Sequence, residues 1–157
     1  MHFWAPKGKR RLLFLGLLVA LALIEFIVLG LARRTFVFYD IDSGLIRVED
    51  RMLKRSPSRE VNIIRYVDEA LLGPVSPDSL PLFPRETRLR SLLYRDGVVY
   101  VDFTEEAVLP PPEGGEVYKN FQTIHAGIRR NFPFVRGVRF FIAGTAAYIE
   151  DFRRTEI

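Results

Sequence analysis

The chain has 157 residues, of which 48% are hydrophobic, and it carries a formal net charge of +4. This length accommodates one domain of ordinary size beside a short additional segment. The absence of cysteine excludes disulfides, thiolate metal ligands, a cysteine nucleophile and lipid attachment through an N-terminal cysteine.

The first element is an apolar stretch of 21 residues, 12–32, whose one charge is Glu25. As a helix rising about 1.5 Å per residue it would be roughly 31 Å long, enough to cross a bilayer. More basic residues precede the stretch than follow it, which predicts a cytoplasmic N-terminus, with 1–11 as a short basic cytoplasmic segment and the rest of the chain outside. A cleaved signal peptide is the alternative, because Gly30-Leu31-Ala32 resembles a cleavage site, but the run exceeds the roughly 7 to 15 apolar residues usual there. We therefore expect a transmembrane helix over 12–32.

Glu25 is unusual, because an acid in the middle of a membrane helix costs about 2.5 to 3.5 kcal/mol on insertion scales. Two explanations remain open. Either Glu25 contacts another membrane helix, or its carboxyl is tolerated near the outer half of the bilayer, where water reaches it.

The charge of the remaining chain is nearly balanced. Residues 1–34 contain six Lys and Arg and one acid, whereas residues 35–157 contain 17 Lys and Arg against 18 Asp and Glu, a net charge of −1. A balanced domain exerts no long-range attraction on phosphate, so nucleic acid is not an expected partner.

The first half of the domain reads as a hairpin followed by a helix. A turn-rich Asp42-Ser43-Gly44 interrupts the strand-like stretch 35–53. Ser56-Pro57 then predicts the start of an amphipathic helix of about 15 residues, which Gly73-Pro74 ends. The apolar stripe of this helix is expected to comprise Val61, Ile64, Val67 and Leu71.

The second half repeats this order. Strands over 88–95 and 98–103 flank Asp96-Gly97, which favours a two-residue type I′ turn. After a proline-rich loop, a second amphipathic helix is predicted, followed by a strand that begins after Gly137 and by a short strand at 147–149. The stripe of the second helix is expected to comprise Val117, Phe121, Ile124 and Ile128.

This order of elements predicts an α+β fold with about five strands and both helices packed on one face of the sheet. The spacing between hairpins leaves room for one core. We expect a single exported domain over 35–149 and a C-terminal tail over 150–157.

Four ordered blocks of the sequence resemble the GerMN domain family, named after a sporulation and germination protein. They are Leu71-Leu72-Gly73-Pro74, PRETRL at 84–89, DGVVYVDFT at 96–104 and FPFVRGVRFFIAG at 132–144. The sequence departs from the family pattern at Thr104, where serine is commoner, and in having one copy of the domain. The resemblance implies a non-enzymatic extracytoplasmic module of bacterial envelope proteins, associated in sporulating relatives with protein assemblies between membranes. It brings no catalytic residue.

Three carboxylates near the second hairpin invite an enzymatic interpretation. Asp102, Glu105 and Glu106 could form the pair of carboxyl groups with which glycoside hydrolases flank a sugar, about 5 to 9.5 Å apart. The simpler interpretation is structural, because Asp102 ends a strand and Thr104 precedes two acids, a pattern that caps a helical turn. We favour the structural one and predict no enzymatic activity.

No metal or cofactor site is expected. Asp40 and Asp42 suggest the start of a calcium loop, but Leu45 and Arg51 stand where that loop needs glycine and an acid. His125 shares the chain with one other histidine, which lies in the N-terminal segment, so a histidine-based metal site or triad lacks partners.

The leading functional expectation is protein–protein assembly in the cell envelope, with other envelope proteins or a second copy of the chain as partner. The alternative is a peptidoglycan-binding module, in which Arg88 and Arg90 share one face of a strand and contact wall carboxylates or phosphates. The same arginines could instead form a solvated face balanced by acids.

Overall fold

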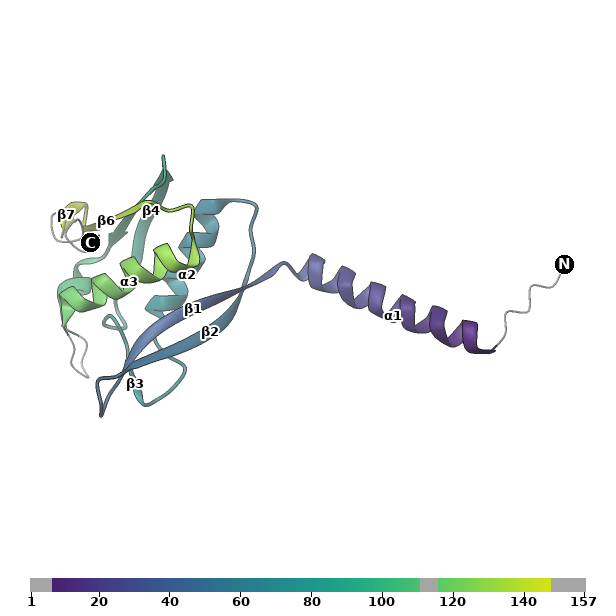
Figure 1. The fold of residues 1–157 in the computed structure, drawn as a ribbon. Helices are drawn as coiled ribbons and strands as arrows, with labels where there is room; N and C mark the ends of the chain where they lie inside the picture. Colours follow the sequence, from purple (N-terminus) through teal and green to yellow (C-terminus); the bar gives the residue numbers. More distant parts are fainter. Residues whose placement is uncertain (1–6, 111–115, 148–157) are drawn as a thin grey trace.

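A computed structural model of the chain describes residues 7–110 and 116–147, and within the first helix it leaves out the side chains of 7–10 and 25–29. The elements in chain order are α1 (Lys7–Leu29), β1 (Leu31–Asp40), β2 (Ile46–Lys54), α2 (Arg59–Leu71), β3 (Ser79–Leu80), β4 (Leu89–Arg95), β5 (Val98–Phe103), the 3₁₀ helix η1 (Glu105–Val108), α3 (Val117–Asn131), β6 (Gly137–Ile142) and β7 (Thr145–Ala147). Figure 1 shows that β1 to β7 and the later helices form one body, from which α1 projects.

The N-terminal helix is shorter at its C-terminal end than the predicted span of 12–32. It ends at Leu29, and Gly30 follows with φ 54°, a conformation that commonly terminates helices. Leu31 and Ala32 already belong to β1, where they pair with Lys54 and Leu53 of β2. The last residues of the predicted span therefore form sheet hydrogen bonds and leave the helix.

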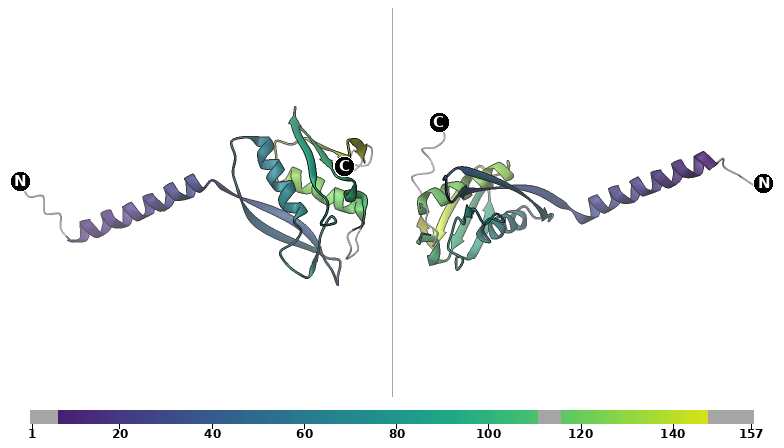
Figure 2. Two further views of the ribbon diagram at one scale, coloured as in Figure 1. Left: turned by 180° about the vertical axis from the view of Figure 1, so that it is seen from behind. Right: turned by 90° about the horizontal axis from the view of Figure 1, so that it is seen from below.

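The described apolar side chains of α1 point into open space. Those from Leu12 to Ile24 are largely exposed, with Leu13 reaching 71%, and two further views show the helix extending clear of the other elements (Figure 2). Over the described part of the chain, however, no helix combines the length and apolarity needed to cross a membrane. The predicted transmembrane helix is thus not supported.

The strands form two sheets, and the fold is α+β as predicted. One sheet has the strand order β2-β1-β3 and the other the order β4-β5-β6-β7, so the expectation of one sheet with about five strands is wrong. The first sheet is mainly a long ribbon, in which nine residue pairs join β1 to β2.

The side chain of Asn131 occupies the edge of β1 that faces away from β2. Its Oδ1 accepts a hydrogen bond from the Thr35 backbone N–H at 2.9 Å, and its Nδ2 donates to the Thr35 carbonyl at 2.7 Å. A backbone strand would satisfy the same two groups. The last residue of α3 therefore takes the place of a strand beside β1, which helps to separate the two sheets.

Tight turns shape the second sheet. Asp96 and Gly97 have φ values of 52° and 84°, in agreement with the predicted type I′ turn between β4 and β5. Ala143 and Gly144, at 49° and 82°, make a similar turn between β6 and β7. The last strand lies at Thr145–Ala147 instead of 147–149, whose last two residues fall outside the described part of the chain. Between the turns β5 and β6 run parallel, with α3 in their connection.

Both helices contact strands of both sheets, α2 contacting β2 and β4, and α3 contacting β1 and β6. Aromatic rings fill the core between these layers: Phe36 stacks on Tyr66 with centroids 4.6 Å apart, and Phe121 meets Phe140 edge-on at 5.1 Å. The two helices therefore link the sheets into one core, although the sheets share no strand pairing.

The predicted stripes of the helices are confirmed for α3 and partly wrong for α2. Phe121, Ile124 and Ile128 of α3 are fully buried. In α2 the buried residues are Ile63, Tyr66, Val67 and Ala70, because this helix is covered from two sides. The helix also starts later than predicted, with Ser58 as its N-cap and Ser56 bonded to the side chain of Asn62.

Candidate functional site

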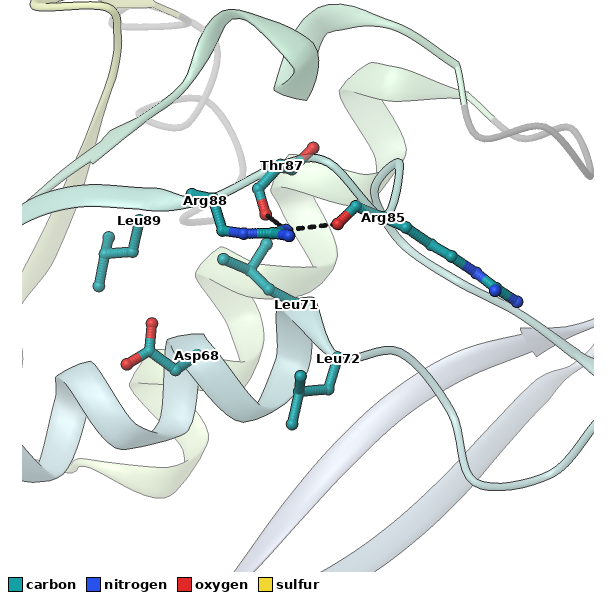
Figure 3. Close-up of a pocket in the computed structure, with 7 residues that line it drawn as sticks. All are labelled: Asp68, Leu71, Leu72, Arg85, Thr87, Arg88 and Leu89. Atoms are coloured by element: carbon teal, nitrogen blue, oxygen red, sulfur yellow. Dashed lines mark hydrogen bonds between the residues drawn. The ribbon is translucent and has the colours of Figure 1, made fainter.

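A hollow of about 590 Å³ lies between the C-terminal end of α2 and the segment that leads into β4. Figure 3 shows the last turns of α2 on one side and the backbone around Thr87 and Arg88 on the other. Its lining comprises Asp68, Leu71, Leu72, Arg85, Thr87, Arg88 and Leu89.

A second hollow, of about 170 Å³, continues the first and shares Leu71, Leu72 and Arg85 with it. It adds Ile41 and most of the loop from Gly73 to Pro81. We call the two hollows together the α2–β4 groove. Two segments that are separated in the sequence thus form opposite sides of one depression.

Two side chains of β2 form hydrogen bonds to the loop that follows α2. Gly73, with φ 84°, turns the chain out of the helix, and the guanidinium of Arg51 donates to its carbonyl at 2.7 Å. Glu49 accepts hydrogen bonds from the backbone N–H groups of Val75 and Ser76 at 3.1 and 3.2 Å. These contacts fix the loop while they leave its apolar side chains outside the core.

The rim of the groove is apolar and exposed. Leu72, which lines both hollows, is 78% exposed, and Ile41 in the second hollow is about half exposed. Val75, between the lining residues Pro74 and Ser76, is 79% exposed. Scattered apolar side chains are normal on a protein surface, but a cluster around a hollow is typical of an interaction site.

The polar groups of the groove are only partly satisfied. The pKa of Asp68 is raised by burial, and neither Asp68 nor Arg85 forms an ion pair within the described residues. The hydroxyls of Ser79 and Thr87 are buried and have no hydrogen-bond partner there either. Buried polar groups are normally hydrogen-bonded, so these two hydroxyls leave the hydrogen bonding of the groove lining incomplete within the described residues.

The structure separates the two arginines of the predicted basic patch. Arg88 lines the groove and donates to the carbonyls of Arg85 and Thr87 (Figure 3). Arg90 lines a different hollow and forms an ion pair with Asp102 at 3.4 Å. The strand register shifts between Leu89 and Ser91, so simple alternation does not hold at this point.

The three carboxylates at the end of β5 and in η1 have structural contacts. Asp102 pairs with Arg90 and accepts a hydrogen bond from the Gly144 N–H at 3.0 Å, which supports the turn between β6 and β7. Glu105 and Glu106 form the first turn of η1, where negative charge is favourable. The hydroxyl of Thr104 makes no capping bond to η1, contrary to expectation. It accepts from the Arg88 N–H at 3.0 Å and lowers the pKa of Glu106 by hydrogen bonding.

Glu25, the predicted contact residue of the membrane helix, is not among the residues that line the groove. Glu25 belongs to α1, but its side chain lies outside the described residues. Among the residues that the structure describes, no group of three or more His, Asp or Glu side chains could hold a metal ion.

The sequence matches a known protein family over most of its length. The profile of the family Germane, described as "Sporulation and spore germination", matches residues 37–148. The chain belongs to the Germane family. This match spans both sheets and the groove, and it confirms the GerMN resemblance of the sequence blocks.

Solved structures show the same Germane-type fold. The first GerMN domain of the sporulation protein GerM from Bacillus subtilis has 20% identity and a TM-score of 0.57, over 74% of this chain and 86% of that chain. The tandem GerMN domains of the same protein have 18% identity and a TM-score of 0.54, over 74% of this chain and 40% of that chain. At these identities the likeness establishes the fold alone. No curated protein matches the chain in sequence.

The groove itself was not predicted from the sequence. Two of the four Germane blocks, Leu71-Leu72-Gly73-Pro74 and PRETRL, lie on its opposite sides. The sequence predicts the first block as the end of a helix and the last two residues of the second as the start of a strand. Their shared place in a family pattern was the available signal that the two segments meet.

Proposed function

We propose that this Germane-family chain is a non-enzymatic module of the bacterial cell envelope that binds other envelope proteins through the α2–β4 groove. The observation that carries the proposal is the exposure of Leu72 and Val75 on a loop that Arg51 and Glu49 hold in place. A fixed apolar rim loses little conformational freedom on binding, which favours protein recognition. Arg85 beside it, which forms no ion pair among the residues that the structure describes, supplies a residue type that is frequent at interface centres.

The same proposal places the domain outside the cytoplasmic membrane. Its support is the apolar sequence over 12–32 with its basic flank, together with the exposure of the apolar side chains of α1. In this arrangement α1 attaches the chain to the membrane and the N-terminus is cytoplasmic. Glu25 then contacts a helix of the partner or of a second copy.

A peptidoglycan-binding module based on Arg88 and Arg90 is the second candidate. Its support is weaker, because Arg90 is paired with Asp102, and Arg88 helps to lower the pKa of Glu106. Both arginines are therefore partly neutralised. A wall hydrolase is disfavoured for a similar reason, since Arg90 and the Gly144 N–H already engage the Asp102 carboxylate.

Site-specific photocrosslinking in intact cells tests the protein-binding proposal. A photoreactive amino acid at position 72 should give one dominant crosslinked protein, whereas the same group at Leu93, on the far side of the second sheet, should not. Leu72→Asp should remove that partner from detergent extracts, and Leu93→Asp should retain it. Equal crosslinking from both positions, or none from position 72, would show that the groove is not the interface.

A further inference from the structure

The outer edge of β2 pairs with no other strand in the described part of the chain. In the first sheet β1 lies between β2 and β3, so β2 has a neighbouring strand on one side only. The Arg55 N–H donates to the Gly30 carbonyl beside β1, and in an antiparallel pair such bonds recur at every second residue. The odd-numbered residues of β2 therefore bond to β1. Val48, Asp50 and Met52 direct their backbone N–H and C=O groups outward.

These outward backbone groups have no hydrogen-bond partner among the residues that the structure describes. Beyond them a side chain reaches the edge, because the guanidinium of Arg65 donates to the Lys54 carbonyl at 2.7 Å. The free edge of β4 is capped in a similar way, since the Tyr94 N–H donates to the Glu60 carboxylate at 2.8 Å. Along 48–52, in contrast, β2 keeps a row of unused donors and acceptors. Such a row is what an additional strand needs for pairing.

The side chains at this edge are apolar and exposed. Ile46 is 66% exposed, and Val48 and Met52 are each 53% exposed. They lie on the face of the ribbon opposite to that of Arg51, which contacts the loop after α2. Side chains directly opposite one another in an added strand would have Cβ atoms about 4.5 to 5.5 Å apart. A strand with apolar residues at the matching positions would therefore cover this exposed surface.

We infer that a second copy of the chain occupies this edge, with the two β2 strands antiparallel and centred on Asp50. In this register Val48 of one copy faces Met52 of the other, and Glu49 faces Arg51. By two-fold symmetry each of these pairings occurs twice. Apolar residues thus meet apolar residues, and acids meet bases. A strand without this pattern would leave the charges of β2 unmatched, which favours the chain itself as the partner.

The two Asp50 side chains face each other at the centre of this pair. Like charges directly opposite normally destabilise paired strands. Here each carboxylate has its own counter-charge on β1, because Arg33 forms an ion pair with it and the Thr35 hydroxyl donates to it at 2.7 Å. Arg33 therefore offsets the repulsion. We expect Arg33→Gln to weaken the dimer and the added change Asp50→Asn to restore it.

This edge is separate from the α2–β4 groove, whose lining includes no residue of β2. Glu49 and Arg51 hold the loop beside the groove, so the test variants avoid both. Changes at Val48, Asp50 and Met52 leave those loop contacts in place. Loss of self-association is therefore distinguishable from loss of a partner that binds the groove.

Sedimentation equilibrium of the 157-residue chain in density-matched detergent measures self-association. We expect a dimer whose dissociation constant rises at least about tenfold in Val48→Pro, because each copy loses one outward N–H donor. Proline is tolerated in an edge strand where its nitrogen faces outward, so the pairing of β1 with β2 should persist. Circular dichroism checks the fold. Val48→Thr keeps the N–H and is the matched control, which should retain the dimer.

The absence of cysteine from the chain allows a direct test of the register. Cα atoms of facing, hydrogen-bonded residues in antiparallel strands lie about 5.5 Å apart, within reach of a disulfide. The Asp50→Cys chain should therefore form a disulfide-linked dimer on mild oxidation. A mixture of the Val48→Cys and Met52→Cys chains should do the same. Neither of these two should crosslink alone, because four residues along a strand span about 13 Å.

Three results would overturn the inference. They are a monomeric parent chain, equal dissociation constants for Val48→Pro and the parent, and crosslinking of Val48→Cys alone as efficient as that of the mixture. If Val48→Pro does not fold, the crosslinking experiment decides by itself, since cysteine at exposed edge positions leaves the core intact.

Discussion

At the scale of single residues, Gly127 of α3 leaves the least room for a side chain among the glycines that were compared in the described part of the chain. A Cβ atom at this position would lie 2.1 Å from the hydroxyl oxygen of Tyr66 on α2. Tyr66 stacks on Phe36 and meets Phe132 edge-on at 5.8 Å, so its ring has little room to move. Gly127 thus sets how closely α2 and α3 approach.

We expect Gly127→Ala to lower the free energy of unfolding by about 1 to 3 kcal/mol through overpacking against Tyr66. Urea denaturation measures the change. Gly137→Ala is the matched control, because its Cβ would meet only Val98 at an ordinary 3.9 Å. Adding Tyr66→Phe to Gly127→Ala removes the hydroxyl and should recover part of the loss. Full stability in the single variant would contradict this account of the packing.

The turn between β1 and β2 contains a strongly perturbed carboxyl. The Ser43 backbone N–H, the Ser43 hydroxyl and Arg47 together lower the pKa of Asp40 from 3.8 to about 2. Because the folded-state pKa is depressed, the stabilisation is fully present above pH 3.8 and is lost as the pH falls through about 2.

Ser43→Ala removes one of the donors, so we expect the pKa of Asp40 to rise toward its usual value. A carbon-detected NMR titration of the side-chain carboxyl measures it directly. Ser76→Ala, in the loop after α2, should leave the titration of Asp40 unchanged. An unshifted midpoint in Ser43→Ala would show that the hydroxyl does not stabilise the carboxylate.

At the scale of elements, α3 completes the first sheet by means of one side chain. Asn131 satisfies the donor and the acceptor of Thr35 and also donates to the Gly127 carbonyl at 2.9 Å. Edge strands with unpaired backbone groups invite pairing with other chains, and this amide blocks part of that edge.

Asn131→Ala leaves both backbone groups of Thr35 without these partners, and we expect a loss of about 1 to 3 kcal/mol in stability. Faster hydrogen exchange at the Thr35 amide should accompany it. Asn131→Asp keeps the acceptor but replaces the donor by a carboxylate oxygen that faces the Thr35 and Gly127 carbonyls, so it should not restore the stability lost in the alanine variant. If exchange at Thr35 stays unchanged in the alanine variant, the amide does not protect this edge.

At the scale of the whole molecule, α1 and the domain differ in how far their apolar side chains are exposed to solvent. The domain buries a cluster of aromatic residues in its core, whereas the described apolar side chains of α1 from Leu12 to Ile24 are exposed. Figure 1 shows that the ribbon of α1 projects away from the domain. In the proposed arrangement lipid covers these side chains, and burying apolar surface is favourable by about 25 cal/mol per Å².

We expect the chain to fractionate with membranes, and Leu17→Arg combined with Leu18→Arg to release a large part of it to the soluble fraction. Sodium carbonate extraction followed by immunoblotting measures the distribution. Leu93→Arg, at an exposed position of β4, should leave the chain in the membrane fraction. Release of the parent chain by carbonate would contradict attachment through α1.

Short sequence windows predicted several local features correctly. The stripe of α3 and the type I′ turn at Asp96-Gly97 depend on neighbouring residues, since helical periodicity and positive φ are local properties. The Germane blocks identified the family for the same reason, because each block is contiguous in the chain. These features belong to the sequence by itself.

The tertiary structure decided what depends on residues far apart in the chain. Asn131 meets Thr35 across 96 positions, and the division into two sheets reflects strand pairings that no local pattern reports. The broader buried face of α2 reflects its contacts with both sheets. The groove likewise exists only because Leu72 and Arg85 approach the same space from two segments. Pairing and burial are set by the free energy of the assembled core, so only the folded chain reveals the surfaces that remain free to bind.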